Sequence, residues 1–453
     1  MKTLQIFNIG KIRIQNILLF VFLTCLINNS ALSQVKKWTL NDCIDRALQE
    51  NTTIKQGQLS NNVSELTLEQ SKANYIPTLS AAGSQGYNFG RSLDPHTNTY
   101  ISQNNKSNNF SVSSSVNLFS GLQTIQTIRK NNLDLKAGTL DLEKTKKDIT
   151  LNVTLAYLQV LFAFEQVEQA QSQVESTQSQ VDKTQILVNA GTLPIGNLYT
   201  VQSQLATDKY SLVNAENQVS ISKVNLMQLM ELPVDTSFTI IRPDLSDLIV
   251  ETSKMTTTDS IYSKALKVQP DIASSDVKIA SAETNLKISK SSLYPRLSLS
   301  TGISSAYSDL RNTTFKQQLN DNLSESVRLN LSIPIFSQKQ VSTSIKKSRI
   351  GIYSSQLNAQ ITRNQLRKNI EQAYNDMLAA RNNYDAVKNQ LVSTETSYSD
   401  SKRKYELGMI TATDYLIAKN NYANALSNLI HAKYNYLFTT KILDFYQGNP
   451  INL

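Results

Sequence analysis

A seven-residue hydrophobic repeat runs through the first half of the chain. Valines recur one heptad apart, with small residues three places after each (Val160, Val167, Val174, Val181 and Val188; Ala163, Ala170, Thr177 and Thr184). Between Leu122 and Asn189 there is no proline and a single glycine, so nothing breaks a helix for about 68 residues. At ~1.5 Å per residue, this pattern predicts a left-handed coiled-coil rod roughly 100 Å long.

The same repeat occurs a second time, at an offset of 217 residues. Its members are Met377, Tyr384, Leu391, Tyr398 and Tyr405, with Ala380, Val387, Thr394 and Ser401 after them. This offset also relates Gly191 to Gly408, and an offset of 218 relates Pro77 to Pro295. Such constancy indicates a tandem duplication. We divide the chain into a leader (1–33), a first repeat (34–233), a linker (234–258) and a second repeat (259–453).

The leader is typical of a secretory signal peptide. A basic start is followed by a short apolar core and by small residues suited to cleavage (Lys2, Lys11 and Arg13; 17–27; Ala31 and Ser33). A membrane anchor is the alternative interpretation of this segment. No later segment has eighteen consecutive apolar residues, so we expect no helical membrane span in the mature chain.

Charge and composition argue against nucleic-acid binding and catalysis. The net charge of +9 falls to +6 without the three basic leader residues, and the remaining basic residues are scattered, so we expect no nucleic-acid partner. The mature chain has one cysteine, Cys43, and two histidines, His96 in a predicted loop and His431 inside a rod. Their spacing makes neither a metal cluster nor a nucleophile with its base, so we expect no enzyme, no metal and no cofactor.

Each repeat begins with a shorter helix and ends with a returning one. Helices predicted at 38–75 and 259–294 end before Pro77 and Pro295, because a residue that precedes proline avoids the helical region. Asn41 or Thr39 is expected to cap the first. The returning helices follow Gly191 and Gly408. A shorter helix and a returning helix together match the length of one long rod.

Between its shorter helix and its long rod, each repeat has two segments with alternating apolar and polar residues. Such alternation over about ten residues is typical of barrel strands with one face in lipid and the other in water. Ordinary soluble hairpins are the alternative. The residues expected to face lipid are Phe110, Val112, Val116, Leu118, Leu297, Leu299, Ile303, Val327, Leu329, Leu331, Ile333 and Ile335.

Four strands cannot close a barrel, and an open strand edge in lipid leaves backbone amides unpaired. We therefore expect a homotrimer with twelve strands and twelve helical rods. The predicted fold class is mainly α with a membrane β part. Long antiparallel coiled-coil helices form an α-barrel, and four strands per chain complete a 12-stranded β-barrel in the trimer.

In this arrangement the mature chain resembles the TolC family of outer-membrane efflux ducts. The resemblance is carried by the opening pattern from Trp38 to Asn51, by Pro77 and Pro295, and by the tip glycines Gly191 and Gly408. It implies an exit duct of a tripartite efflux or type I secretion system in the bacterial outer membrane, with its helical part in the periplasm. A periplasmic adaptor (membrane fusion) protein and an inner-membrane transporter would be its partners. A secreted structural coiled-coil scaffold is the alternative.

The resemblance also implies a periplasmic gate. Asp414 fits the acidic ring of the family and Tyr405 its gate tyrosine. Asn197 replaces a family acid, and Ile410 stands where some members carry an arginine, so we expect a gate of Asp414, Asn197 and apolar side chains without a salt bridge. The alternative is that Asp414 and Asn197 are helix N-caps after the turn.

The turns at the two helical tips are the expected contact with the adaptor. Small and apolar groups on exposed turns suit insertion into a groove of a helical partner, although ordinary turn chemistry is an alternative. The residues concerned are Ala190, Gly191, Thr192 and Leu193 in the first repeat and Leu407, Gly408, Met409, Ile410 and Thr411 in the second.

Overall fold

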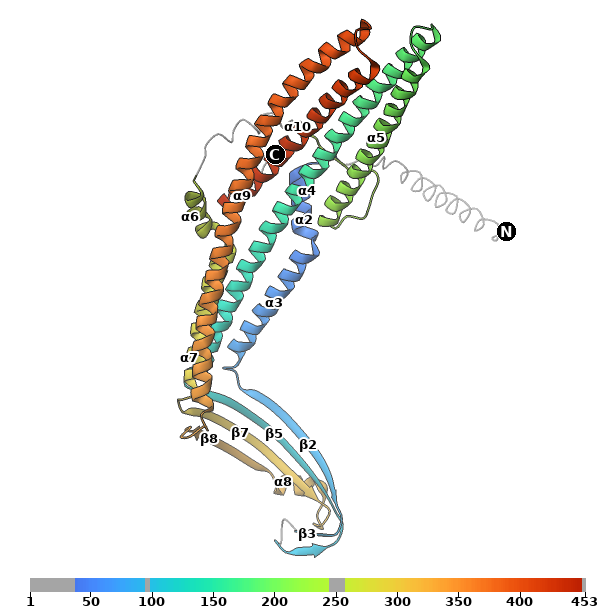
Figure 1. The fold of residues 1–453 in the computed structure, drawn as a ribbon. Helices are drawn as coiled ribbons and strands as arrows, with labels where there is room; N and C mark the ends of the chain where they lie inside the picture. The colour runs from blue at the N-terminus through green and yellow to red at the C-terminus, as the bar shows by residue number, and fades with distance from the viewer. Residues whose placement is uncertain (1–36, 94–97, 244–256, 450–453) are drawn as a thin grey trace, which may run out of the picture.

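The computed structural model describes residues 37–93, 98–243 and 257–449. It is an elongated, bent molecule with long helices at one end and a curved sheet at the other (Figure 1). The predicted leader and His96 lie outside the described residues, as does most of the linker. Within the described ranges, no helix is both long enough and apolar enough to cross a membrane.

The two halves of the chain contain the same series of elements. The first half has α2 (Leu40–Glu50), α3 (Thr52–Ala73), β2 (Thr78–Asn88), β5 (Asn105–Phe119), α4 (Gln123–Asn189) and α5 (Ile195–Leu229). The second half has α6 (Thr258–Val268), α7 (Pro270–Ser291), β7 (Arg296–Ser308), β8 (Ser324–Ser332), α9 (Gln340–Glu406) and α10 (Ala412–Gln447). The two long rods, α4 and α9, have 67 residues each, close to the length that the absence of proline predicts.

The predicted shorter helices are each broken in two. At Asn51 the backbone leaves the helical region. The Asn51 side chain caps α3, because its Oδ1 accepts from Thr53 N, and its Nδ2 donates to Leu229 O at the end of α5. The second break falls at Gln269, before Pro270, which occupies the first position of α7. Trp38, expected in the first helix, lies instead in the short strand β1 (Lys37–Trp38). Thr39 caps α2, as one of the two predicted alternatives stated.

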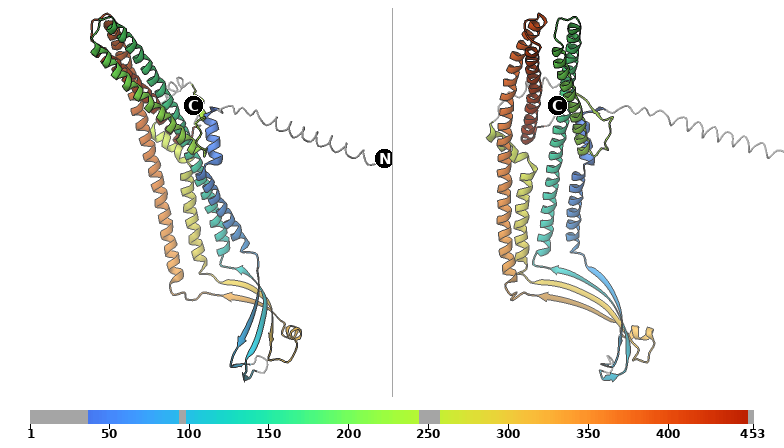
Figure 2. Two further views of the ribbon diagram at one scale, coloured as in Figure 1. Left: turned by 90° about the vertical axis from the view of Figure 1, so that its right-hand side faces the viewer. Right: turned by 45° about the vertical axis from the view of Figure 1, so that its right-hand side comes forward.

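The helices form a layer whose order follows the sheet. In the lower half α9, α7, α4 and α3 lie side by side, and they continue β8, β7, β5 and β2 (Figure 2). In the upper half α10 packs against α9, and α5 packs against α4. The main buried cluster lies midway, where α2, α4, α5 and α10 meet. There β1 pairs with β6 (Thr239–Ile240), and the Tyr157 hydroxyl donates to the carbonyl oxygen of Ile241.

The four-stranded sheet is antiparallel throughout, in the order β2-β5-β7-β8. Its register repeats the duplication: Thr78 pairs with Ser115 in the first repeat, and Arg296 pairs with Ser332 at the equivalent place in the second. The duplication seen in the sequence is therefore present in the backbone pairing.

The ends of the strands differ from the prediction. β8 ends at Ser332, so Ile333 and Ile335 lie outside the strand, because Pro334 lacks the amide that would continue the ladder. Leu118 falls at an irregularity between Asn117 and Phe119, which breaks the alternation of side chains. Two short strands, β3 (Arg91–Leu93) and β4 (Tyr100–Ser102), lie between β2 and β5. A short helix that the sequence did not indicate, α8 (Phe315–Asp321), follows β7.

A tight turn between β5 and α4 leads to a stability prediction. Gly121 has φ of +62°, and a Cβ atom there would lie 2.5 Å from the carbonyl oxygen of Ser291. Gly191 has φ of +74° but open space around it. Gly191→Ala is expected to cost about 1–2 kcal/mol of backbone strain. Gly121→Ala is expected to cost about 1–3 kcal/mol more, because Ser291 must move.

Thermal unfolding of the two variants beside the native chain measures this difference. Equal midpoints for Gly121→Ala and Gly191→Ala would show that the close approach at Gly121 does not constrain the fold.

Candidate functional site

Both helical tips are closed by the same turn. Gly191 and Gly408 follow α4 and α9 with φ of +74° and +73°. In each turn the two residues after the cap donate backward: Gly191 N to Val188 O and Thr192 N to Leu187 O, and likewise Gly408 and Met409 to Tyr405 and Lys404. This is the Schellman pattern, which satisfies the last carbonyls of a helix. The positive φ explains why glycine occupies both positions.

The helices that leave the tips start differently in the two repeats. In α10 the Thr411 hydroxyl accepts from Asp414 N, and the Asp414 carboxylate accepts from Thr411 N and from its hydroxyl at 2.7 Å. Asp414 is therefore the third residue of a capping box, with an exposed side chain. The equivalent cap of α5 is Pro194, which has no side-chain hydrogen bond. Asn197 is not an N-cap either, which corrects that alternative for Asn197.

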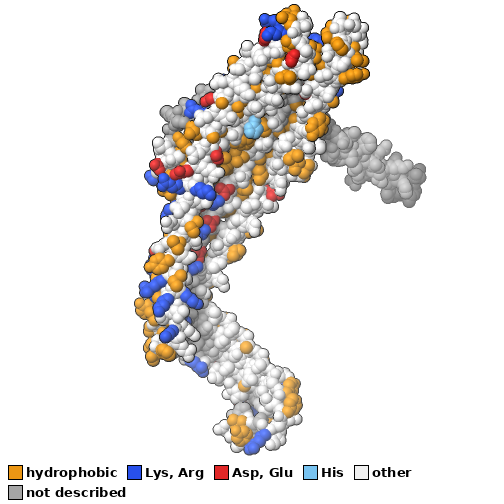
Figure 3. Space-filling view, viewed as in Figure 1, with side chains coloured by type: hydrophobic (Ala, Val, Ile, Leu, Met, Phe, Trp, Pro, Cys, Tyr) orange, Lys and Arg blue, Asp and Glu red, His pale blue; other side chains and the backbone are white. Residues whose placement is uncertain are grey.

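Between the two tips lies a groove of about 710 Å³. It brings together Asn197, Tyr405 and Ile410 of the predicted gate, whereas Asp414 does not line it. Residues of both turns also line it, namely Thr192, Leu193, Leu407, Gly408 and Thr411. Hydrophobic side chains gather at this end of the molecule (Figure 3), where Leu407 and Met409 are each 68% exposed.

A row of stacked tyrosines fills the contact between α9 and α10 near the tip. Tyr405 stacks on Tyr415 at 4.9 Å between ring centroids, and Tyr398 stacks on Tyr422 at 5.3 Å. The Tyr398 and Tyr415 hydroxyl oxygens are 3.4 Å apart, and burial is the main cause that raises the pKa of Tyr415. Among the described residues, the Tyr405 hydroxyl is buried without a hydrogen-bond partner. A buried polar atom of this kind is uncommon.

A buried polar network joins the two helical hairpins deeper in the molecule. Lys419 on α10 donates to the Thr177 hydroxyl on α4 at 2.7 Å, and that hydroxyl lies 2.5 Å from a carboxylate oxygen of Asp208 on α5. Gln204 donates to the other carboxylate oxygen of Asp208 at 2.7 Å. Thr177 is fully buried, and Lys419 and Asp208 are 2% and 6% exposed. The network therefore connects the two repeats through the Thr177 hydroxyl and through Gln204, whose Oε1 accepts from Asn420 Nδ2 on α10 at 3.2 Å.

Sequence reasoning missed this network. The available signal was Thr177 itself, a polar residue in the heptad contact, whose partners lie 31 and 242 positions away. Pairing over such separations cannot be read from one rod alone. The described residues hold no group of three or more histidine, cysteine, aspartate or glutamate side chains that could bind a metal ion.

The sheet register separates an apolar face from a polar one. Successive strands place Ala81, Val112 and Ile303 in one cross-strand row and Val116, Leu299 and Leu329 in another. Nine of the twelve residues predicted to face lipid lie on the apolar face: Phe110, Val112, Val116, Leu297, Leu299, Ile303, Val327, Leu329 and Leu331. The other three, Leu118, Ile333 and Ile335, do not. Glu325, opposite Ile303, is a charged residue on the same face.

The opposite face of the sheet is polar. Thr78, Ser115, Ser300 and Arg328 form one row across it, and the Thr78 and Ser115 hydroxyls are 2.9 Å apart. In the view of Figure 3 most of the sheet surface is uncharged polar side chain or backbone.

The buried network predicts a pH dependence of stability. Burial lowers the pKa of Lys419 from 10.5 to about 8, and Asp208 opposes this shift. Between these two pH values the unfolded chain binds more protons than the folded chain, so the free energy of unfolding rises with pH. Across this window the native chain is expected to gain about 1–3 kcal/mol relative to Lys419→Met.

Denaturant unfolding at several pH values measures this gain as a difference between the two proteins. Lys402→Met, which removes an exposed lysine of α9, should keep the native slope. Parallel curves for the native chain and Lys419→Met would contradict the prediction.

Comparison with known proteins places the chain in a family. The model of the outer membrane efflux protein family matches the chain twice, at residues 43–231 and 261–449. Toxin and drug export protein A of Aggregatibacter actinomycetemcomitans is 21% identical over 416 residues, 90% of this chain and 86% of that protein. Outer membrane protein TolC of Escherichia coli (strain K12) is 24% identical over 258 residues, 55% of this chain and 51% of that protein.

Solved structures share the fold at low identity. The CusC crystal structure has a TM-score of 0.78 at 15% identity and covers 91% of this chain and 92% of its own. The Campylobacter jejuni CmeC outer membrane channel has a TM-score of 0.74 at 18% identity, over 90% and 85%. The resemblance predicted from the sequence is confirmed, as is the mainly helical fold with its internal duplication. Because the family model covers most of the chain in two consecutive matches, the chain belongs to the outer membrane efflux protein family, and it is an efflux channel protein of the outer membrane.

Proposed function

We propose that three copies of this chain close into one tube, which serves as the exit duct of a tripartite efflux or type I secretion system. Its helical tips would meet a periplasmic adaptor protein and an inner-membrane transporter. Small molecules or proteins would pass through the tube to the exterior. The observation that carries this proposal is a sheet whose two edges are both open and complementary.

The open edges are β2 and β8. In the described residues, β2 pairs only with β5 and β8 pairs only with β7. In lipid an unpaired edge costs several kcal/mol for each unsatisfied backbone group, so these edges require partners. Joining β8 of one copy to β2 of the next satisfies both edges and repeats around a ring.

The helical layer has matching edges. Exposed apolar side chains follow helical spacing on α3 at Leu59, Val63 and Leu66, and on α9 at Ile350, Tyr353, Leu357 and Ile361. These stripes lie on the outer helices of the layer, in line with the open strands β2 and β8 (Figure 2). Contact between α3 of one copy and α9 of the next would bury both stripes, which favours the same head-to-tail ring.

Within this ring the two faces of the sheet acquire roles. The apolar face, with Val112, Leu329 and their row neighbours, would meet lipid, and the serine-rich face would line the water-filled bore. Leu118, Ile333 and Ile335 are left out of the lipid-facing strands in this proposal. The exposed Ile333 and Ile335 would instead lie at the junction with the helices.

The tips would form the gate and the adaptor contact. Three Asp414 carboxylates around the mouth favour cations, and Asn197, Tyr405 and Ile410 line the adjoining groove. The groove and the exposed Leu407 and Met409 suit a helical hairpin of an adaptor.

We assign the chain no catalytic role of its own, because its family and its fold are those of channel proteins. The alternative of a secreted coiled-coil scaffold explains the heptads. It does not explain a two-faced sheet that continues the rods.

A cysteine pair tests the ring. Within the chain Ser115 pairs with Ser300, and the equivalent positions in the other repeat are Ser332 and Ala82. Ala82→Cys with Ser332→Cys is therefore expected to crosslink neighbouring subunits into a covalent trimer, seen by non-reducing electrophoresis. The native Cys43 is buried and should not compete.

Ala82→Cys with Ser111→Cys is the matched control, because these residues pair within one chain and should leave a monomer. A covalent monomer from the Ala82 and Ser332 pair, or no crosslink at all, would contradict the ring.

Asp414 can be tested in planar bilayers. Asp414→Ala is expected to widen the mouth and remove negative charge, so conductance should rise and cation preference should fall. Thr411→Ala breaks the same capping box, at a cost of about 1 kcal/mol, but keeps the carboxylate, so its cation preference should remain. If both variants keep the native conductance and ion preference, Asp414 is only a helix-capping residue.

A further inference from the structure

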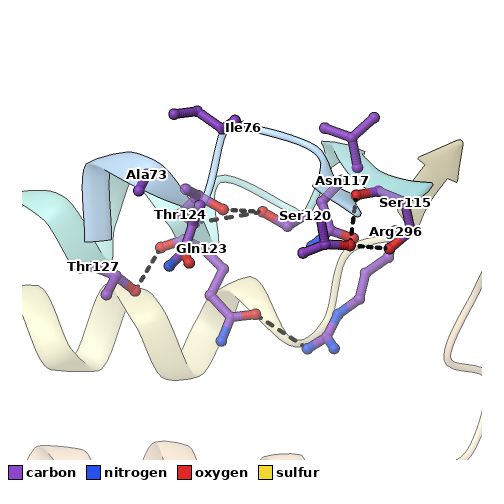
Figure 4. Close-up of a pocket in the computed structure, with 12 residues that line it drawn as sticks. Ala73, Ile76, Ser115, Asn117, Ser120, Gln123, Thr124, Thr127 and Arg296 are labelled. Carbon is purple, nitrogen blue, oxygen red and sulfur yellow. Dashed lines mark hydrogen bonds between the residues drawn. The ribbon is translucent and has the colours of Figure 1, made fainter. Parts of the chain in front are cut away.

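A polar cavity lies where the sheet meets the helices. Its volume is about 510 Å³, and three parts of the chain line it: the α3–β2 junction, the β5–α4 junction and the start of β7 (Figure 4). The side chains include hydroxyls and amides at Asn74, Thr78, Ser115, Asn117, Ser120, Gln123, Thr124 and Thr127.

The cavity holds one cation and no acid. Arg296, the first residue of β7, is the only charged residue among its lining residues. An arginine NH2 group of Arg296 donates to Gln123 Oε1 at 3.2 Å, and that acceptor is neutral. Among the described residues Arg296 forms no ion pair, whereas Arg311 and Arg363 each have one and Arg367 has two. The guanidinium charge therefore remains uncompensated inside a cavity rich in hydrogen-bond donors.

The sheet register places this cation on the polar face. Arg296 lies on the same face as Ser298 and Ser300, two and four positions along β7, and Ser300 shares a row with Thr78 and Ser115. The counterpart of Arg296 in the first repeat is Thr78, which is uncharged. The duplication therefore places no second arginine at the position equivalent to Arg296.

We propose that this cavity is a binding subsite for oxyanions, so that carboxylate or phosphate groups of the cargo are held briefly at the junction of sheet and helices. The inference rests on the proposed function in one respect: the polar face must line the bore. A guanidinium has five donors in a planar fork that matches the two oxygens of a carboxylate or phosphate. Gln123 takes one of these donors and fixes the orientation of the fork, which makes it a positioning residue.

The hydroxyls around the guanidinium complete the site. Ser120 and Thr124 lie 2.9 Å apart through their oxygens, as do Thr78 and Ser115, and each hydroxyl can rotate to donate to an anion. Because no carboxylate lines the cavity, an entering anion meets no fixed like charge. Weak, multiple contacts of this kind permit release, which a conduit needs.

Titration calorimetry of the detergent-purified full chain tests the subsite directly. At fixed ionic strength, citrate and inorganic phosphate are titrated separately, with chloride as the reference salt. The expected result is saturable binding of one anion per chain, weakened at least tenfold by Arg296→Gln. Citrate binding without phosphate binding would assign carboxylate-bearing cargo, and the reverse would assign phosphate-bearing cargo.

Arg328→Gln is the matched control, because Arg328 lies on the same polar face but outside the cavity. It should bind citrate and phosphate as the native chain does. Equal weakening by Arg296→Gln and Arg328→Gln would show a diffuse charge effect and overturn the subsite. Absence of saturable binding to the native chain would also overturn it. Both arginines are exposed, so the thermal midpoints of the variants should match the native value.

The oxyanion-binding test and the crosslinking test of the ring can fail independently. If the subunits crosslink through Ala82 and Ser332 but bind no oxyanion, the duct is supported and the subsite is contradicted. If the chain binds oxyanions but forms no ring, the binding cavity is supported and its role in transport is contradicted. In a conducting channel, citrate should cause brief current interruptions that Arg296→Gln abolishes.

Discussion

Backbone hydrogen bonds between β5 and β7 join the two repeats of the chain, and the other elements take their places from this pairing. Because α4 continues β5 and α7 precedes β7, the strand order also sets the order of the helices. The register matters as much as the order. A slip of one residue would move Ile303 and Leu299 to the polar face and bring serines to the apolar one. The two-faced sheet and the apolar edges of the layer therefore depend on one antiparallel ladder.

The two repeats keep one backbone plan but have diverged in chemistry. In the first repeat, the contact between α4 and α5 near the tip is formed by Val181, Leu198 and Leu205. The equivalent contact between α9 and α10 in the second repeat is formed by Tyr398, Tyr415 and Tyr422. Stacked tyrosines bury large rings and still present hydroxyls, so this contact retains hydrogen-bonding capacity that valine and leucine lack. The buried Lys419, Thr177 and Asp208 add a polar connection between the repeats.

Much of this architecture could be predicted from the sequence because its signals are long and periodic. The heptads, the proline-free rods and the tip glycines each act over a local stretch, and the alternation of residues such as Val327 and Leu329 marks the faces of the strands. The sequence-based predictions failed where a single side chain or a contact between distant residues determines the structure. The Asn51 side chain caps α3 by accepting from Thr53 N and contacts the end of α5 through Leu229 O, and the Thr177 network depends on residues from three helices.

The tip site was predictable only in outline. The sequence indicated the residues of both turns and, by resemblance, Asn197, Tyr405 and Ile410, which share one groove. It did not indicate that Asp414 takes part in a capping box while its counterpart helix begins at Pro194, because the choice of cap depends on local side-chain geometry. The place of Leu118 outside the alternation and the end of β8 at Ser332 likewise depend on a bulge and on Pro334.

The divergence of the two tips has a consequence for stoichiometry. Each chain carries two hairpin ends with the same glycine turn, so a ring of three chains would present six ends. Only three of these ends would be chemically alike, since one kind starts its returning helix at Pro194 and the other at Thr411. A partner ring of six identical subunits would therefore contact two kinds of hairpin end in alternation. Such a partner ring would have to bind with pseudo-sixfold symmetry, or its subunits would have to bind as three pairs.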